Sequence, residues 1–251
     1  MEIGLYQAAS GMKALWDQQQ VITDNLARSA VAGHRATNVA FKIETPTGSK
    51  ELNSNSLGIS GLPVTTQPFL NFSQGTLVPS SSPFHLAIQG TDSFFTIQQP
   101  DGKIAYTRNG AFEKNADGDI VLNDGSKLLA EGGAPLNVGT DGKDITISNS
   151  GEVMAGNTSL GKISFTRFTH PLEDIPANGS GHFVPKEGAA TESGLGPLER
   201  VSQGHLEQSN EEPVHQMVSM IEVMRAYEAN KQILTTQDDT TGRLLSVVAG
   251  S

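Results

Sequence analysis

The feature that most constrains the fold is a series of turn dipeptides in the middle of the chain. Six of them occur: Asp101-Gly102, Asn109-Gly110, Asp117-Gly118, Asp124-Gly125, Asp141-Gly142 and Ser150-Gly151. They alternate with short runs that are rich in β-branched and aromatic residues, such as FFTIQQ, IAYTRN, DITIS and KISFTRF. Asp-Gly and Asn-Gly between such runs favour tight hairpin turns. This region therefore predicts an antiparallel β domain.

The N-terminal segment has a helical pattern instead. Apolar or small residues recur there at alternating steps of three and four, with Gln19 as the one polar member of the row: Leu5, Ala8, Met12, Leu15, Gln19, Ile22 and Leu26. This spacing is typical of a helix with a heptad seam. No proline precedes Pro46, and Gly33 is a plausible terminator, so we expect a helix from about residue 2 to 29.

The C-terminal segment predicts a second and longer helix. It begins at Pro213, after two acidic residues that suit a helix N-terminus. One row of its residues keeps the same alternation: Met217, Met220, Met224, Tyr227, Lys231, Leu234, Asp238, Thr241, Leu245 and Val248. A second, adjacent row contains Val214, Val218, Ile221 and Met224. Two rows on one helix imply more than one neighbour.

These patterns divide the chain into a β domain inserted between two terminal helices. The predicted boundaries are residues 1–35 for the first helix, 36–82 for an extended connector, 83–200 for the β domain and 201–251 for the second helix. The connector is rich in Ser, Thr, Asn, Gly and Pro, as in TPTGSKELNSNSLGISGLP. We expect it to be extended or to form loose strands.

Charge and composition exclude several functions. The formal net charge is −10 and no cluster of Lys and Arg occurs, so nucleic acid is not an expected partner. The chain has no cysteine, which excludes disulfides and thiolate chemistry. The first residues, MEIGLYQAASGMKALWDQQQ, do not match a cleaved signal peptide. No run approaches the roughly 20 apolar residues of a membrane span, so we expect no membrane insertion.

The sequence contains none of the common catalytic or metal-binding motifs. The six histidines are scattered without metal-ligand spacing, and the common hydrolase and nucleotide-binding motifs do not occur. Asp117, Asp119 and Asp124 suggest a calcium loop, but Val121 stands where such a loop needs Asp or Asn. We read these acids as turn formers. The sequence predicts no enzyme, metal, cofactor or small-molecule substrate, although a carboxylate pair for glycoside hydrolysis stays open as a background possibility.

Three stretches, in order along the chain, resemble one family. They are SGMKALWDQQQVITDNLA at residues 10–27, FHLAIQGTDSFFTIQQPDGKIAYTRNGAF at 84–112, and VSQGHLEQSNEEPVHQMVSMIEVMRAYEANKQILTTQD at 201–238. Together they are similar to the signatures of the flagellar rod and hook protein family. The positions that carry the resemblance at the two ends are Ser10, Gly11, Met12, Asn25, Leu26, Gln203, Gly204, Ser209, Asn210, Arg225, Ala226, Tyr227, Glu228 and Asn230.

The chain departs from the family pattern at both helix ends. After the first helix the family usually has a segment like NTPGFK, whereas residues 30–35 read AVAGHR and lack the aromatic residue. Glu211 follows Ser209-Asn210, where the family tends to place an apolar residue. These differences weaken any transfer of detailed contacts to the helix ends of this chain.

The resemblance implies a structural subunit of the bacterial flagellar rod. In such proteins the terminal helices pair as a coiled coil, so the implied fold class is α+β, with coiled-coil ends and an inserted antiparallel β domain. Subunits polymerise helically through these helices to form the drive shaft and line the export channel. One row of the second helix would then pack on the first helix, and the other row on neighbouring subunits.

The resemblance also implies partners and a location. The implied partners are copies of the chain itself, the proximal and distal rod proteins and the flagellar type III export apparatus. The implied location is the flagellar basal body in the periplasm. The chain length favours a rod protein over the much longer hook protein. The stretch at residues 131–138, EGGAPLNV, and the divergent end of the first helix favour the proximal over the distal rod position. The predicted interface residues are Leu5, Ala8, Met12, Leu15, Ile22, Leu26, Val214, Met217, Val218, Met220, Ile221, Met224, Tyr227, Leu234 and Leu245.

Two other classes of function are alternatives. A cell-surface adhesion or carbohydrate-binding module would use the β domain for a ligand and the helices for trimerisation. It predicts clustered aromatic residues, whereas the ten Phe, three Tyr and one Trp are spread along the chain. A peptidoglycan hydrolase would need a convergent pair of acids or a metal site, and the sequence contains no motif that indicates either one.

Overall fold

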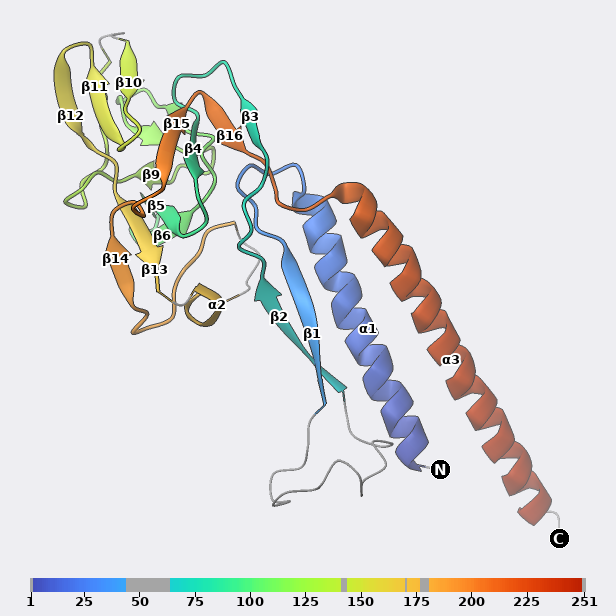
Figure 1. The fold of residues 1–251 in the computed structure, drawn as a ribbon. Coiled ribbons are helices and arrows are strands. Elements are labelled where there is room, and N and C mark those ends of the chain that lie inside the picture. Colours follow the sequence, from blue (N-terminus) through green and yellow to red (C-terminus); the bar gives the residue numbers. More distant parts are fainter. Residues whose placement is uncertain (1, 44–63, 141–143, 170, 177–180, 250–251) are drawn as a thin grey trace. The chain divides into compact units, whose positions relative to one another are not determined.

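The structure is a computed structural model that describes residues 2–43, 64–140, 144–169, 171–176 and 181–249 (Figure 1). The chain forms two compact units. The first, here called the helical unit, consists of Met1–Leu26, Asn38–Pro68 and Pro213–Ser251, and the second, the β unit, consists of Ala27–Thr37 and Phe69–Glu212. Neither long helix carries an apolar stretch of the length that a bilayer crossing requires, within the residues described.

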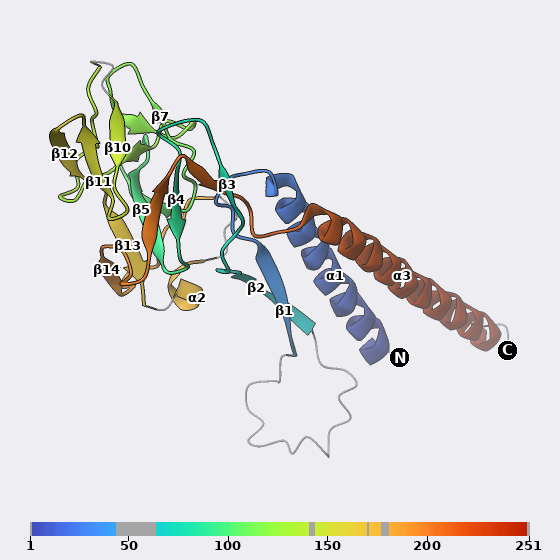
Figure 2. The same cartoon turned by 45° about the horizontal axis from the view of Figure 1, so that its top comes forward.

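The helical unit contains the two long helices and a two-stranded sheet. Helix α1 spans Glu2–Arg28 and α3 spans Pro213–Ala249, while β1 (Thr37–Ile43) pairs with β2 (Val64–Leu70). Pro213 stands at the first position of α3, where its missing N–H costs no hydrogen bond. In both views α1 lies between the β1–β2 sheet and α3 (Figures 1 and 2).

The predicted fold class is wrong. The chain is β-rich with terminal helices, and its long helices do not form the coiled coil that was expected. On α3 the second predicted row is exposed, together with Met217 of the first row: Val214, Met217, Val218, Ile221 and Met224 have exposed fractions of 46% to 65%. The physical reason is that a heptad pattern reports an apolar face without identifying what covers it.

The β unit consists of antiparallel strands in several small sheets. The largest has the order β14-β13-β5-β9-β8-β7 with β6 also on β5, and the others are β10-β11-β12, β15-β4 and β16-β3. The elements are β3 Leu77–Pro79, β4 Leu86–Gln89, β5 Ser93–Gln98, β6 Ile104–Thr107, β7 Glu113–Lys114, β8 Ile120–Val121, β9 Lys127–Leu128, β10 Ile145–Ile147, β11 Glu152–Ala155, β12 Thr158–Lys162, β13 Phe165–Phe168, α2 Pro171–Asp174, β14 Thr191–Ser193, β15 Arg200–Gln203 and β16 His205–Glu207.

Four of the six predicted turn dipeptides close turns. The N–H groups of Gly102, Gly118, Gly125 and Gly151 each donate to the carbonyl three residues earlier. Asp141-Gly142 lies outside the described residues. The sixth, Asn109-Gly110, serves a close approach instead of a hairpin: the Gly110 carbonyl accepts the Leu86 N–H at 3.0 Å, and an added Cβ would meet the Leu86 oxygen at 1.6 Å. Only glycine fits there.

Two apolar clusters hold the β unit together. The larger contains the buried side chains of most strands, with the Phe95 ring edge-on to Phe112 at 5.3 Å. The smaller is aromatic, with Phe94 at 5.4 Å from both Phe168 and Phe183. Because the strands are only two to six residues long in this unit, side-chain packing stabilises them more than ladder length does.

Candidate assembly surface

The most conspicuous surface feature is a row of exposed apolar side chains on α3, here called the apolar stripe. It consists of Val214, Met217, Val218, Ile221 and Met224. Successive members are one to three residues apart, so they lie on one face over three turns of the helix. Apolar side chains scattered singly over a surface are ordinary, whereas a contiguous row marks a contact site.

The opposite face of α3 is the one that is covered. Gln216 and Val223 are buried, and Met220, Tyr227 and Leu234 are half-buried. The structure therefore splits the row that the sequence suggested. Met220, Tyr227 and Leu234 lie on the covered face, whereas Met217 and Met224 belong to the stripe.

On α1 the covered positions differ only partly from the predicted ones. Ile22 is buried as part of the predicted seam, but Ala14 and Asn25 are also buried and were not in it. The other seam residues, Ala8, Met12, Leu15 and Leu26, are half-buried, and the motif residues Ser10 and Gly11 share that state. The side chains of Leu5 and Leu245 lie outside the described part of the chain.

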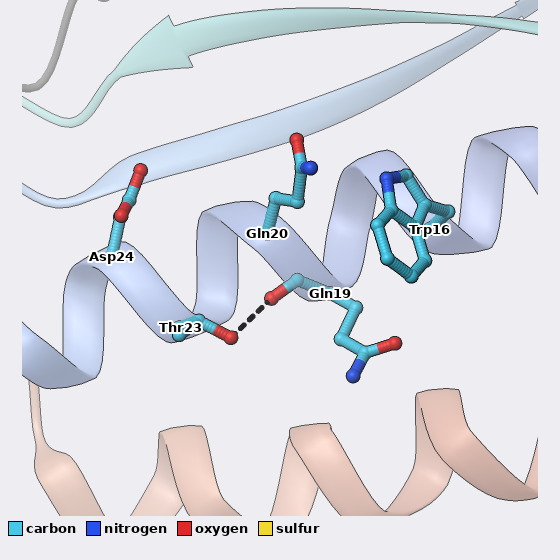
Figure 3. Close-up of a pocket in the computed structure, with 5 residues that line it drawn as sticks. All are labelled: Trp16, Gln19, Gln20, Thr23 and Asp24. Atoms are coloured by element: carbon cyan, nitrogen blue, oxygen red, sulfur yellow. Dashed lines mark hydrogen bonds between the residues drawn. The ribbon is translucent and has the colours of Figure 1, made fainter.

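A pocket of about 330 Å³ lies on α1 (Figure 3). Its lining residues are Trp16, Gln19, Gln20, Thr23 and Asp24. Gln20 and Asp24 project on the side of the β1 and β2 strands and Gln19 on the side of α3. The Trp16 side chain is 52% exposed, which is unusual for the largest apolar residue. The α1 pocket thus combines an indole ring with amide, hydroxyl and carboxylate groups.

The hairpin is fixed to α1 by Asp17. Its carboxylate accepts a hydrogen bond from the Thr66 hydroxyl at 2.7 Å and forms an ion pair with Lys13 at 2.9 Å. The Thr66 and Lys13 hydrogen bonds lower the pKa of Asp17. Asp17 is therefore ionised at neutral pH and links β2 to the face of α1 beside the pocket.

Inside the β unit lies a buried ion cluster, formed by Arg35, Arg108, Glu199 and Glu207. Arg35 Nη1 is 2.7 Å from Glu207 Oε1, and Arg108 Nη1 is 3.5 Å from Glu207 Oε2, with all three side chains fully buried. Arg108 also lies 5.0 Å from the centre of the Phe94 ring. Buried charges persist only when they are paired.

Two groups of the ion cluster, Arg108 and Glu199, have shifted pKa values. Burial and the neighbouring Arg35 lower the pKa of Arg108 to about 10, which leaves it protonated at neutral pH. Burial acts to raise the pKa of Glu199, but hydrogen bonds from Ser93 and from backbone N–H groups outweigh burial and lower that pKa overall. Two cations therefore meet two anions in a medium of low dielectric constant.

The ion cluster lies where three chain segments meet, here called the chain junction: residues 33–36, 71–75 and 207–210. The Gly33 N–H donates to the Glu207 carbonyl at 2.7 Å. The Asn210 side chain accepts from the Ala36 N–H at 2.8 Å and donates to the Asn71 carbonyl at 2.8 Å. Gly33 has φ +67°, and an added Cβ would meet the Arg108 backbone at 2.2 Å.

The family-motif residues of the C-terminal half have identifiable contacts. Gln203 donates to the Pro83 and Ile145 carbonyls, and Gly204 accepts the Ser80 N–H at 2.7 Å. Ser209 is buried and its hydroxyl accepts the Glu211 N–H. On α3, Ala226, Tyr227 and Asn230 are half-buried, whereas Arg225 and Glu228 are exposed.

Sequence reasoning missed the ion cluster. Arg35 and Glu207 were noticed only as parts of motifs, and Arg108 was not singled out at all. One signal was available, because Arg108 interrupts the β-type run IAYTRN with a charge. Within the described residues no group of three or more His, Asp or Glu side chains is suited to a metal ion.

Two family models match the chain. The model described as the flagellar hook protein FlgE/F/G D1 domain matches residues 87–155. The model described as the flagellar basal body rod FlgEFG protein C-terminal matches residues 202–247. The second match contains the end of the chain junction and the whole apolar stripe.

Curated relatives cover nearly the full length. The chain is 32% identical to the flagellar basal-body rod protein FlgG of Agrobacterium fabrum, over 92% of this chain and 94% of the relative. It is 32% identical to FlgF of Mesorhizobium japonicum, over 91% and 90%. It is 28% identical to FlgF of Salmonella typhimurium, over 97% of both chains.

Proposed function

The chain belongs to the family of flagellar basal-body rod proteins, which are structural components and not enzymes, and from this premise we propose how it assembles. It polymerises helically through its terminal helices, with copies of itself and with other rod subunits, to form the drive shaft and line the export channel. The observation that carries this proposal is the exposed apolar stripe on α3.

The energetics favour a partner on the stripe. Full burial of one Val, Ile or Met side chain is worth about 1.5–3 kcal/mol. Burial of the exposed half of all five side chains would therefore stabilise a contact by on the order of 5 kcal/mol. That is enough to contribute substantially to an interface, and too much to leave in water without a function.

The position of the surfaces favours an open polymer over a closed dimer. The apolar stripe lies on α3 and the α1 pocket lies on another helix, so they are different surfaces of the same unit. A contact between two different surfaces is heterologous, and it propagates into a helical filament when the rotation does not close. Such a contact is what a rod subunit needs.

We also propose the finer details of location and export. The subunit lies in the periplasmic part of the basal body, reaches it without a cleaved signal peptide and meets the flagellar type III export apparatus on the way. Family membership supports these statements. For the position along the rod, relatives of both the FlgF and the FlgG type are equally similar at 32% identity. The proximal position stays a prediction that rests on residues 131–138 and on the divergent end of α1.

The test of the assembly role is a charge on the stripe. Ile221→Asp and Met224→Asp each place a carboxylate where an apolar contact is expected, so we expect loss of swimming in cells that rely on the variant chain. Circular dichroism of the purified variant should remain unchanged, because both positions are about half exposed in the single chain. Wild-type swimming of both variants would contradict the proposal.

A matched control is available on the same helix. Ile233 is 56% exposed, as Ile221 is 52%, but it lies about 120° further round α3 and outside the stripe. Ile233→Asp should leave swimming closer to normal than Ile221→Asp does. Equal loss from the two changes would show that the stripe is not the decisive face.

A further inference from the structure

The α1 pocket has the composition of a receptor for an arginine side chain. It offers an exposed indole ring at Trp16, a carboxylate at Asp24 and amides at Gln19 and Gln20. A guanidinium group binds a carboxylate through two parallel hydrogen bonds, and its stem and plane stack on aromatic rings. A volume of about 330 Å³ accommodates one large side chain.

The Asp24 carboxylate has no cation of its own. Among the described residues it takes part in no ion pair or hydrogen bond. The neighbouring acid on the same helix, Asp17, is already paired with Lys13 and Thr66. Asp24 is therefore the group in the pocket that a further cation would find available.

Arg225 on α3 is the matching group. It is exposed, and within the described part of the chain its guanidinium forms no ion pair or hydrogen bond. It follows Ile221 by four residues, so it continues the apolar stripe by one turn on the same face. Lys231 is two turns further and lies off the line of the stripe, and Arg243 already has an interaction. Among the Lys and Arg residues in the described part of α3, Arg225 is therefore the one that lies nearest the stripe on the same face.

We infer that the α1 pocket of one subunit binds the Arg225 side chain of a second copy of this chain. The inference rests on the proposed function and assigns a specific contact within it. The methylene stem of Arg225 lies against Trp16, and its guanidinium reaches Asp24, with the amide of Gln20 between them. Trp16, Gln20 and Asp24 follow one another at four-residue steps, so they form one row on α1 along which the side chain can lie.

The two interactions support each other. Burial of the apolar stripe on the neighbouring α1 supplies most of the contact energy, and the Arg225 to Asp24 pair fixes the register, because a misplaced guanidinium would leave both charges unpaired. The charge pair thus determines the specificity of the contact, and the stripe provides most of its affinity.

Charge reversal tests the pair. Asp24→Arg and Arg225→Asp should each abolish swimming, since a lost or opposed charge pair at an interface weakens the contact on the order of 30-fold or more. The double variant Asp24→Arg/Arg225→Asp re-creates the pair with reversed polarity at every contact and should restore swimming. No restoration, with both single variants non-motile and folded, would overturn the inference. Normal swimming of either single variant would also overturn it.

Crosslinking establishes that the partners are different chains. The chain has no cysteine, so single cysteines can be placed at will. A chain with Gln20→Cys and a differently tagged chain with Glu228→Cys retain Trp16, Asp24 and Arg225. In basal bodies assembled from both chains, a short bismaleimide should join the two tags. The absence of a crosslink between the two tags, in basal bodies that contain both chains, would overturn the inference.

The outcomes separate this contact from the assembly role. If Ile221→Asp abolishes swimming but charge reversal is not rescued, the stripe functions without the Arg225 contact and only the inference fails. If Ile221→Asp and Met224→Asp both swim normally, the proposed function itself fails. A crosslink from Gln20 to another rod protein in place of the second copy would assign the pocket to a different partner and overturn the inference.

Discussion

Glu207 is the central residue of the buried ion cluster. Its carboxylate lies between the guanidinium groups of Arg35 and Arg108, and all three side chains are fully buried. Its Oε1 atom also accepts the Gly75 N–H at 3.0 Å, and its carbonyl accepts the Gly33 N–H. One residue therefore holds two cations and two backbone segments in place.

Glu207→Gln should destabilise the β unit strongly. The amide leaves two guanidinium groups buried without their shared anion, and breaking a buried pair costs about 3–5 kcal/mol of unfolding free energy. Urea denaturation followed by circular dichroism measures the change. Glu192→Gln is the control, because Glu192 pairs with Arg167 at an exposed site and such pairs contribute at most about 1 kcal/mol. Equal effects of the two changes would contradict the role assigned to Glu207.

The sequence could not have predicted this cluster. Arg35, Arg108 and Glu207 come from the segment after α1, the end of β6 and β16, and only the folded sheet brings these distant segments together. A single sequence shows that a charge interrupts an apolar run, but not which charge it will meet. Four of the six turn dipeptides were predictable, because their conformation is decided by adjacent residues.

At the scale of the element, the helices were predictable and their faces were not. Spacing and the absence of proline indicate α1 and α3. The covered face of α3, however, includes the polar residues Gln216 and Asn230, while six large apolar residues, the five of the stripe and Ile233, remain exposed. In a subunit that assembles with partners, an apolar pattern marks two kinds of helix face. One face is buried within the single chain, and the other is buried only against a partner subunit.

The attachment of the hairpin to α1 should depend on pH. Hydrogen bonds from Thr66 and Lys13 lower the pKa of Asp17 from 3.8, so the folded-state pKa lies below the unfolded one. The stabilisation is present above about pH 4 and is lost as the pH falls through the folded-state value. The protection of the β2 amides against hydrogen exchange, relative to the intrinsic exchange rate at each pH, should fall at acid pH in the wild type, and Asp17→Asn should remove this dependence.

The neighbouring acid gives the control for this experiment. Asp24→Asn changes an exposed carboxylate on the same helix that has no ion pair among the described residues. It should leave the acid dependence of the β2 amides as in the wild type. Loss of this pH dependence with Asp24→Asn as well would show that the general charge of α1, and not the Thr66 contact, holds the hairpin.

At the scale of the whole molecule, the two units differ in how much apolar surface they bury. The β unit has two clusters with many fully buried side chains. In the described part of the helical unit, the fully covered apolar side chains of the long helices are few, among them Ala14, Ile22 and Val223. Local opening is easiest where few apolar contacts would be lost.

Limited proteolysis of the purified subunit should therefore cut α3 first. The expected stable fragment retains the β unit up to about Glu212, with fragment masses as the measurement. Assembled basal bodies should protect α3, because partner subunits would cover the stripe. Early cleavage within the β unit, with α3 intact, would contradict this distribution of stability.

The chain junction has a consequence for the evolution of such subunits. The chain enters the β unit at Ala27, leaves it at Thr37, re-enters at Phe69 and leaves again at Glu212. Hydrogen bonds of Asn210 and Glu207 tie together the segments next to the last three of these four crossings. The β unit is thus inserted into the helical unit as a cassette, and the ends of this cassette are held next to one another. Insertions, deletions or exchange of strands inside the cassette leave its ends where they are. Outer domains of different size can therefore be carried on one helical framework.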